Sequence, residues 1–248
     1  MSRAVQDHQR GPDFSLERQA LEQPQDLFQT ISSSHYVLGI DEAGRGPWAG
    51  PVTAAAAWIN PNALSHLPQG LNDSKKISAI KRAALFEELR ALPETVFRFA
   101  VASREAALID DNGILAETFA AMDQAASVLI DDLVNDDQEA VTILVDGNLA
   151  PKMTRTRDRL KAPPQIIPVI KGDARSLSIA AASIMAKETR DRIMTSLDQE
   201  HPQYGWATNM GYGTADHRAA LAKHGPTQWH RLSYKPVALI ATQFGYTR

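Results

Sequence analysis

The chain has 248 residues, of which 44% are hydrophobic and 22% are charged, and its net charge is −3 at neutral pH. These values are typical of a soluble globular protein long enough to bury a core without covalent staples. Cysteine is absent from the sequence, which excludes disulfides, zinc–thiolate sites and cysteine nucleophiles. No apolar run is long enough to cross a bilayer, so we expect a cytoplasmic protein without a membrane partner.

The first 34 residues are rich in glutamine and charged residues, and they lack the apolar core of a secretory signal. This composition predicts a polar, flexible extension. We therefore expect the folded domain to cover residues 35–248, with a helical subregion at about 207–248 as its C-terminal part.

Apolar runs with strand-like composition follow one another from residue 36 onward. They lie at 36–40, 51–59, 95–101, 141–145 and 165–170. The spacing of apolar residues predicts helices at 78–92, 114–133, 177–197 and 214–224. Pro168 cannot donate a backbone hydrogen bond, so the last strand is expected at a sheet edge or bulge. Strands first, and then strands alternating with helices, predict an α/β fold with helices packed on a mixed sheet.

Three of the predicted strands are followed by acidic residues. Asp41 and Glu42 follow the first strand, Asp146 follows the fourth and Asp173 follows the fifth. Ligands collect outside the carboxyl ends of strands in open α/β sheets. Four carboxylates gathered there would repel one another unless a cation neutralised them. One or two Mg²⁺ or Mn²⁺ ions fit, since hard cations prefer oxygen ligands.

The residues alone leave two points about this site open. Asp146 and Asp173, each taken alone, also fit ordinary turn chemistry, in which an aspartate caps the backbone after a strand. Adjacent strand residues point to opposite faces, so Glu42 joins Asp41 in one site only if the strand breaks there. Gly44 makes such a break reasonable.

A glycine–arginine–glycine turn, Gly44-Arg45-Gly46, comes directly after the first acidic pair. Backbone N–H groups and an arginine in such a turn suit a phosphate or a sugar edge. Between residues 152 and 192 the sequence has ten basic and four acidic residues, a net charge of +6 on an acidic chain. This pattern fits a surface for a polyanion, although a merely solvated charged segment would have the same composition.

The motifs resemble one known family, ribonuclease HII (RNase H type 2), in the same order along the chain. They are GIDEAGRGPWAGP at 39–51, LNDSKKI at 71–77, LVDGN at 144–148, KGD at 171–173, AAASIMAK at 180–187, GYGTADH at 211–217 and HRLSYKPV at 230–237. The resemblance implies an RNase H-like mixed β-sheet flanked by helices, with a small C-terminal helical part. It also implies a monomeric, Mg²⁺- or Mn²⁺-dependent endoribonuclease whose catalytic and metal-binding residues are Asp41, Glu42, Asp146 and Asp173.

The implied substrates are RNA–DNA hybrids and duplex DNA containing single ribonucleotides. Cleavage 5′ of the ribonucleotide by a metal-activated water would leave a 3′-hydroxyl and a 5′-phosphate. In the family, Gly44, Arg45 and Gly46 correspond to the loop that grips the ribose 2′-hydroxyl, and Tyr212 to the tyrosine that packs on the next sugar. The other implied substrate contacts are Asn72, Ser74, Lys75 and Lys76 at the phosphate backbone, Ser183 and Lys187 on the long helix, and His230 and Arg231 at the DNA backbone.

The chain also departs from the family. Asn209 and Met210 stand where bacterial relatives often have His-Lys, so a polar contact and a charge are expected to be missing. The basic stretch 152–161 is longer than usual and is expected to add affinity for a nucleic-acid backbone. Two alternatives stay open on sequence grounds: a related two-metal nuclease of the ribonuclease HIII or HI type, and a nucleic-acid-binding module without activity.

Overall fold

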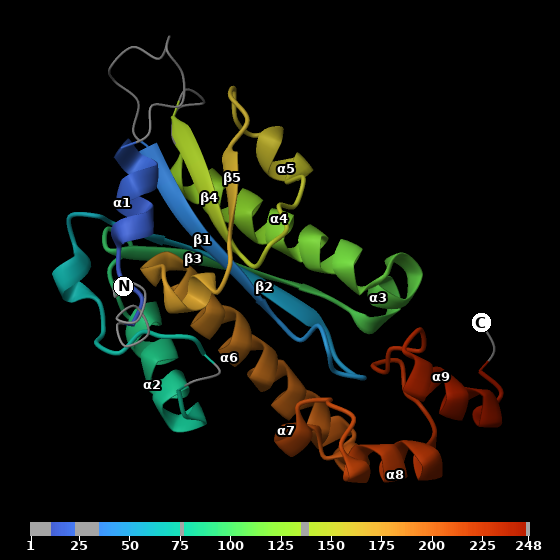
Figure 1. Ribbon diagram of the computed structural model, residues 1–248. Coiled ribbons are helices and arrows are strands. Elements are labelled where there is room, and N and C mark those ends of the chain that lie inside the picture. The colour runs from blue at the N-terminus through green and yellow to red at the C-terminus, as the bar shows by residue number, and fades with distance from the viewer. Residues whose placement is uncertain (1–10, 23–34, 75–76, 135–138, 247–248) are drawn as a thin grey trace, which may run out of the picture.

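The computed structural model describes residues 11–22, 35–74, 77–134 and 139–246. Within these ranges five strands form one mixed sheet in the order β3-β2-β1-β4-β5 (Figure 1). The strands are β1 (His35–Ala43), β2 (Val52–Ile59), β3 (Phe97–Arg104), β4 (Ala140–Asp146) and β5 (Gln165–Val169). The first three pair antiparallel, whereas β4 and β5 run parallel to β1. All five predicted strands are confirmed, and Pro168 lies in the edge strand β5 as expected.

The four predicted helices are confirmed as α2 (Ala79–Arg90), α4 (Ile114–Leu133), α6 (Leu177–Glu200) and α8 (Ala215–His224). Shorter helices were not predicted, because one or two turns carry too little periodicity to recognise. They are α1 (Ser15–Glu22), α3 (Ala106–Asn112), α5 (Thr154–Arg157), α7 (Trp206–Asn209) and α9 (Lys235–Ala241), with short 3-10 helices at η1 (Leu64–His66), η2 (Gly172–Ala174), η3 (Pro202–Tyr204) and η4 (Thr242–Phe244).

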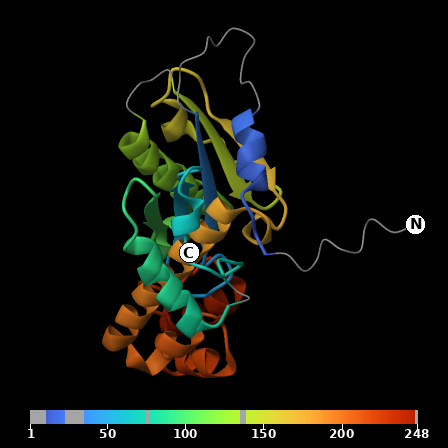
Figure 2. The ribbon, with the colours of Figure 1, turned by 90° about the vertical axis from the view of Figure 1, so that its left-hand side faces the viewer.

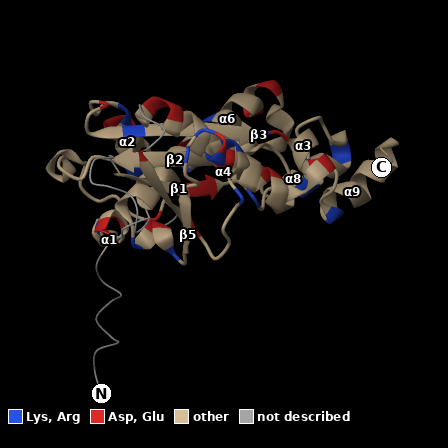
Figure 3. Ribbon diagram, turned by 90° about the horizontal axis from the view of Figure 1, so that it is seen from above, with Lys and Arg blue, Asp and Glu red and all other residues tan. Residues whose placement is uncertain are grey.

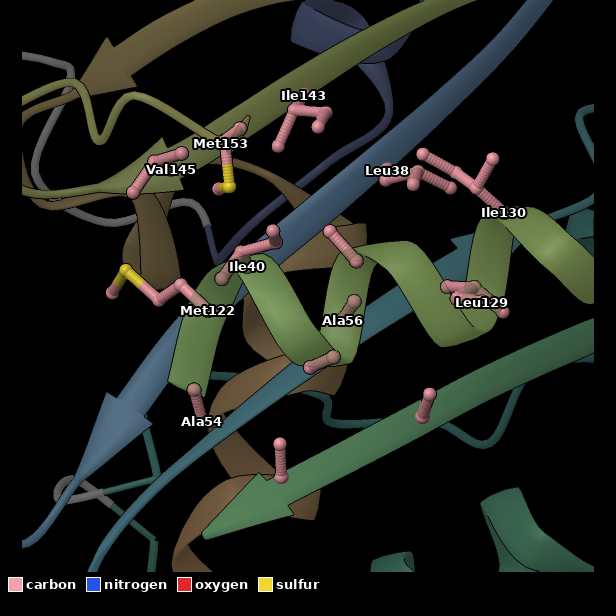
Figure 4. Packing of buried hydrophobic residues seen from close by; sticks show 14 of the residues in the cluster. Leu38, Ile40, Ala54, Ala56, Met122, Leu129, Ile130, Ile143, Val145 and Met153 are labelled. Carbon is pink, nitrogen blue, oxygen red and sulfur yellow. The ribbon is translucent and has the colours of Figure 1, made fainter. Parts of the chain in front are cut away.

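Helices cover both faces of the sheet, and each face has its own core. On one face α4 packs against alternate residues of the strands, among them Leu38, Ile40, Ile143 and Val145 (Figure 4). On the other face α6 and α2 pack against the remaining set, including Ala55, Ala57 and Ile59 of β2. This two-sided burial follows from the period of two along a strand, which sends successive side chains to opposite faces.

Gly39 brings α6 close to the central strand. A Cβ atom at this position would lie 2.2 Å from the backbone of Ser178 in α6, so only glycine permits the contact. Asp41 lies two residues further along β1 and therefore faces the same helix. The strand and its glycine thus place the first carboxylate between the sheet and α6.

The prediction of a flexible extension is wrong for residues 11–22. Phe14, just before α1, and Ala20, within it, are buried against the domain, while residues 1–10 and 23–34 lie outside the described residues. Glu17 is fully buried, and its Oε1 accepts hydrogen bonds from the Ser178 amide at 2.9 Å and from two serine hydroxyls at the start of α6. The polar composition concealed an apolar face of one short helix.

The C-terminal helices α7, α8 and α9 gather at one end of the molecule, beyond the end of the sheet (Figure 2). In the described ranges no single helix has the length and apolar character needed to span a membrane; α3 and α4 together satisfy the length and composition, but they meet at a bend of 120°. Helix α4 is instead the buried helix of one sheet face.

Candidate active site

Three carboxylates from different parts of the chain meet at one end of the sheet. Asp41 lies in β1, Asp146 ends β4, and Asp173 lies in the 3-10 turn η2 that follows β5. One oxygen from each lies within 4.8 Å of those of the other two. Because β1, β4 and β5 run parallel, their carboxyl ends share one edge, which confirms the juxtaposition expected from sequence.

Asp41 is the electrostatic centre of this cluster, with only 2% of its surface exposed. Burial raises the pKa of Asp41 well above its usual value, and the negative charges of Glu42 and Asp146 raise it further. The Glu42 amide, which donates to Asp41 Oδ1 at 2.7 Å, and the Ser183 hydroxyl oppose that shift. Among the described residues Oδ2 of Asp41 is buried without a hydrogen-bond partner. A buried oxygen without a donor, between two other carboxylates, suits a divalent cation.

Gly172 holds the second and third carboxylates together. Its amide donates to Asp146 Oδ1 at 2.7 Å, and Asp173 is the next residue. A Cβ atom on Gly172 would lie 2.6 Å from Ile179 Cδ1 and 3.2 Å from that same Asp146 oxygen. The glycine of the Lys-Gly-Asp motif therefore lets the turn approach β4 and α6 closely, and a side chain here would displace Ile179 and crowd Asp146.

Glu42 is not one of the three carboxylates in the cluster. The strand does not break after Asp41, because β1 continues through Ala43 and pairs Glu42 with Ala54 of β2. The side chain of Glu42 thus leaves the strand on the opposite side from Asp41. Its carboxylate interacts with the Arg45 guanidinium at 3.3 Å, yet it remains near enough for its charge to raise the pKa of Asp41.

The glycine–arginine–glycine turn lies beside Tyr212, about 170 residues away in sequence. A Cβ atom on Gly46 would lie 3.5 Å from Tyr212 Cε1, and the tyrosine is 48% exposed. Gly44 has a φ of +95°, a backbone conformation that residues with a side chain rarely adopt. Arg190 also packs against it, because a Cβ atom there would lie 2.0 Å from Arg190 Nε. The turn and the exposed ring form one surface next to the carboxylates.

The backbone N–H groups of this turn point outward. The carbonyls of Gly44 and Arg45 accept hydrogen bonds from the buried Arg231. In a trans peptide the N–H points opposite to the C=O, so the amides of Arg45 and Gly46 point away from Arg231. Within the described part of the chain neither amide has a hydrogen-bond acceptor. Two adjacent free donors are therefore presented beside Tyr212.

The other residues predicted to contact substrate lie partly in the interior. Ser74 and Ser183 are buried, and their hydroxyls bond to each other at 2.8 Å, so Ser74 meets α6 rather than open solvent. Asn72 is half-buried and accepts from the Asp73 amide, while Lys75 and Lys76 lie outside the described residues. These serines belong to the support of Asp41, through Ser183.

Lys187 lies on the same side of α6 as Ser183, one turn further on. Its ammonium pairs with Asp191, which also accepts from Arg82 at 2.8 Å. Burial lowers the pKa of Lys187, and Asp191 acts in the opposite direction. The lysine is thus part of an ionic cluster between α2 and α6, with 22% of its side chain exposed.

His230 and Arg231 do not reach the surface, which corrects the expectation that they contact a DNA backbone. Their exposed fractions are 1% and 0%. The sequence indicates that the pair is functional but predicts the wrong role, because an arginine in a motif usually lies at the surface. Only the tertiary fold shows that Arg231 faces the turn at residues 44–50.

Buried histidines support Tyr212 from behind. The Thr227 amide donates to His230 Nδ1, so the proton of His230 lies on Nε2 and points toward His217 Nε2, 3.1 Å away. Trp206 donates to the same His217 nitrogen, so His217 carries its own proton on Nδ1 and donates it to the Tyr212 carbonyl at 2.9 Å. Both histidines are therefore neutral, and burial lowers the pKa of His217 and that of His230, the latter to about 3.

Asn209, at the position where the sequence departs from bacterial relatives, also supports the tyrosine loop. Its side chain donates to the Tyr204 carbonyl at 2.7 Å and accepts from the Gly211 amide at 2.8 Å. The carboxamide thus fixes the backbone just before Tyr212.

Solved structures share this fold. The ribonuclease H2 of Pyrococcus horikoshii OT3 aligns with a TM-score of 0.61 and 25% identity, over 86% of this chain and all of that one. The Mn²⁺ complex of Bst-RNase HIII aligns with a TM-score of 0.65 and 20% identity, over 91% of this chain and 75% of that one. The fold and the carboxylate cluster define a metal-dependent endoribonuclease with an RNase H fold.

Sequence comparison gives the family. The family model for ribonuclease HII matches residues 38–237. A curated relative, the ribonuclease HII of Ruegeria sp. (strain TM1040), is 44% identical over 232 residues, which cover 94% of this chain and 88% of the relative. The chain belongs to the ribonuclease HII family, and its activity is that of a ribonuclease H on RNA–DNA hybrids.

Proposed function

We propose that this enzyme also incises duplex DNA 5′ of a single embedded ribonucleotide, leaving a 3′-hydroxyl and a 5′-phosphate. The observation that carries the proposal is the pair of free backbone donors at Arg45 and Gly46, which lie in a turn four residues after Asp41. The 2′-hydroxyl that distinguishes ribose from deoxyribose accepts such hydrogen bonds. The two amides and the carboxylates could therefore contact the same nucleotide.

The cation of the site is proposed to be Mg²⁺ or Mn²⁺, with one or two ions bound. Asp41, Asp146 and Asp173 would hold it, and Glu42 contributes negative charge from the other side of β1. When bound, such a cation polarises the scissile phosphate and lowers the pKa of the attacking water. An all-carboxylate donor set favours these hard cations over softer metals, and the related Bst-RNase HIII binds Mn²⁺.

Tyr212 is proposed to pack on the sugar next to the ribonucleotide. Its ring is half-exposed beside Gly46, while its backbone is fixed by His217 and by the Asn209 carbonyl. A sugar without a 2′-hydroxyl packs more closely on an aromatic face than a ribose does, so the ring favours deoxyribose at this position. The turn and the ring would together select an RNA-to-DNA junction.

The basic segment 152–161 is proposed to contact the backbone of the same duplex. Its five cations are all exposed: Lys152, Arg155, Arg157, Arg159 and Lys161. Along the rest of the ribbon, basic and acidic residues are interspersed (Figure 3). Asp123 of α4 anchors the segment, because its carboxylate accepts from the amides of Arg155 and Thr156 at 2.9 and 3.0 Å. The cations are therefore carried on an ordered element rather than on a loose loop.

We further propose that the enzyme acts as a monomer in the cytoplasm and without a membrane partner. The complete absence of cysteine fits a reducing compartment.

The direct test is incubation with a labelled DNA duplex that contains one ribonucleotide, in Mg²⁺ or Mn²⁺. The proposal predicts one incision 5′ of the ribonucleotide and a product with a 3′-hydroxyl. An all-DNA duplex is the substrate control, and a duplex with a longer RNA tract confirms that the preparation is active. Cleavage of the RNA tract without incision at the single ribonucleotide would overturn the proposal while leaving the hybrid activity intact.

A further inference from the structure

The guanidinium of Arg231 is, like that of Arg190, a positive charge in the interior of the protein. It is fully buried, and all five of its N–H donors are used. They bond to the carbonyls of Gly44 (2.6 Å), Arg45 (2.9 Å) and Gly50 (3.1 and 2.9 Å) and to the hydroxyl of Tyr234 (2.9 Å). Every acceptor is a neutral oxygen, so no carboxylate bonds to this buried charge; backbone dipoles stabilise it, together with the nearby negative charge of Asp110.

These acceptors belong to one short loop. Gly44 and Arg45 are its beginning and Gly50 is near its end, so Arg231 closes the loop from behind, about 185 residues further along the chain. The segment that carries Arg231 is itself fixed: Asp110 of α3 accepts from the amides of Leu232 and Ser233, both at 2.8 Å. The fold therefore holds the guanidinium in place before any substrate binds.

We propose that Arg231 is a positioning residue for recognition of the ribose: it holds two carbonyls inward so that the amides of Arg45 and Gly46 point at the 2′-hydroxyl. The inference rests on the proposed reading of that hydroxyl by the turn. Peptide geometry links the two sides, because an inward C=O requires an outward N–H at the next residue. Without Arg231 the glycine-rich turn has other conformations open to it, since glycine restricts the backbone least.

The planar, five-donor shape of arginine is what the site uses. Lysine keeps the positive charge but offers three donors from a single nitrogen, which cannot span three carbonyls and a hydroxyl. If Arg231 served only as a buried charge near the substrate phosphates, Arg231→Lys would restore function. A positioning role predicts that it does not.

The experiment uses the full chain with Asp146→Asn as a non-cleaving background. Binding of a single-ribonucleotide duplex is compared with binding of the matched all-DNA duplex, for this background alone and with Arg231→Lys or Arg231→Met added. Amide hydrogen exchange is measured without nucleic acid at Trp48 and Gly50, two amides of the same loop that are protected because they donate to the carbonyls of Gly211 and Trp229 at 2.8 and 2.9 Å. Arg98→Lys is the matched control, since Arg98 also bonds to a backbone carbonyl and to Asp132 but lies at the start of β3, remote from the turn.

Both Arg231 variants are expected to reduce the preference for the ribonucleotide duplex by about tenfold, the value of one to two hydrogen bonds. Exchange at the two amides is expected to accelerate, while Arg98→Lys changes neither quantity. Unchanged exchange and preference in Arg231→Lys would overturn the inference. If the background itself has no preference for ribose, the proposed reading of the 2′-hydroxyl fails, and the exchange data alone decide whether Arg231 holds the turn.

Discussion

The candidate active site has two halves that are held in place by different kinds of contact. The sheet half is the carboxylate cluster of Asp41, Asp146 and Asp173, and the reading half is the turn at residues 44–46 with Tyr212. The carboxylate cluster is a product of the sheet: parallel strands end at one edge, and the period of two sends Asp41 and Asp146 to the face covered by α6. The turn at residues 44–46 is instead held by residues more than 140 positions away. Arg231 donates hydrogen bonds to the carbonyls of Gly44 and Arg45, and Arg190 packs against Gly44 and donates to the Ala49 carbonyl. Local strand geometry therefore fixes the carboxylate cluster, whereas long-range contacts fix the turn that we propose to contact the ribose.

Asp146→Asn tests the contribution of the sheet half to cleavage most sharply. Removing one charged ligand is expected to lower the cleavage rate by about a thousandfold, because a carboxamide neutralises cations poorly and the cation supplies several kcal/mol of transition-state stabilisation. The fold and the affinity for hybrid should be retained, since Asn keeps an oxygen that can accept from Gly172. Single-turnover rates and duplex binding measure both; substantial residual cleavage would remove Asp146 from the site.

The C-terminal helical region supports the reading half, and we expect it to lose folding stability as the pH falls. The pKa of His230 is about 3 in the folded protein and 6.5 for a free side chain, so the unfolded chain binds the proton first as the pH falls below 6.5. Stability is then lost progressively, by about 2 kcal/mol between pH 7 and pH 5 from this group. Urea unfolding at the two pH values measures the loss. His230→Asn should show a smaller difference; an identical difference would mean that His230 does not couple to folding.

Tyr212→Ala separates substrate reading from metal binding within one assay. Loss of the ring is expected to lower the rate on a single-ribonucleotide duplex by about tenfold, which is the lower end of the range for a base stacked on an aromatic side chain and is taken here for the sugar. The dependence on Mn²⁺ concentration should not change, because Tyr212 contacts Gly46 rather than the carboxylates. Tyr212→Phe is the control that keeps the ring. A shift in metal dependence would contradict the separation of the two halves.

The basic segment is a third surface, outside both halves, and its effect is expected to be the smallest. Charge reversal of Arg155, Arg157 and Arg159 should flatten the salt dependence of duplex binding. The log–log slope should fall by up to about 0.9 for each phosphate that the segment no longer neutralises. Reversal of the exposed Arg90 on α2, compared with reversal of Arg157 alone, tests whether one change of charge has this effect wherever it lies on the surface. An unchanged slope in the triple variant would place the duplex elsewhere on the surface.

The sequence predicted the sheet half well, because its determinants are local. Alternation and strand ends were sufficient to bring Asp41, Asp146 and Asp173 together, and the one geometric doubt, about Glu42, was justified by a strand that continues to Ala43. The helix α1 escaped prediction because a buried Glu17 looks like any surface glutamate until Ser176 and Ser178 are seen around it.

For the reading half, only the exposed residues could be predicted from the sequence. Family resemblance pointed to the turn and to Tyr212, but no pattern in the sequence reveals that Arg231 is buried behind the turn. A guanidinium bonded to backbone carbonyls leaves no charge partner to find in sequence, because every residue has a carbonyl. Supports of this kind emerge only from the three-dimensional contacts.

The division between the two halves is tested most directly by the Mn²⁺ dependence of single-ribonucleotide incision in the wild-type enzyme and in Arg231→Lys. If the sheet alone fixes the metal site, both proteins reach half-maximal rate at the same Mn²⁺ concentration, and the variant has the lower maximal rate. A variant that needs more Mn²⁺ but reaches the wild-type maximum would show that the turn and its arginine support the metal instead, which contradicts the account.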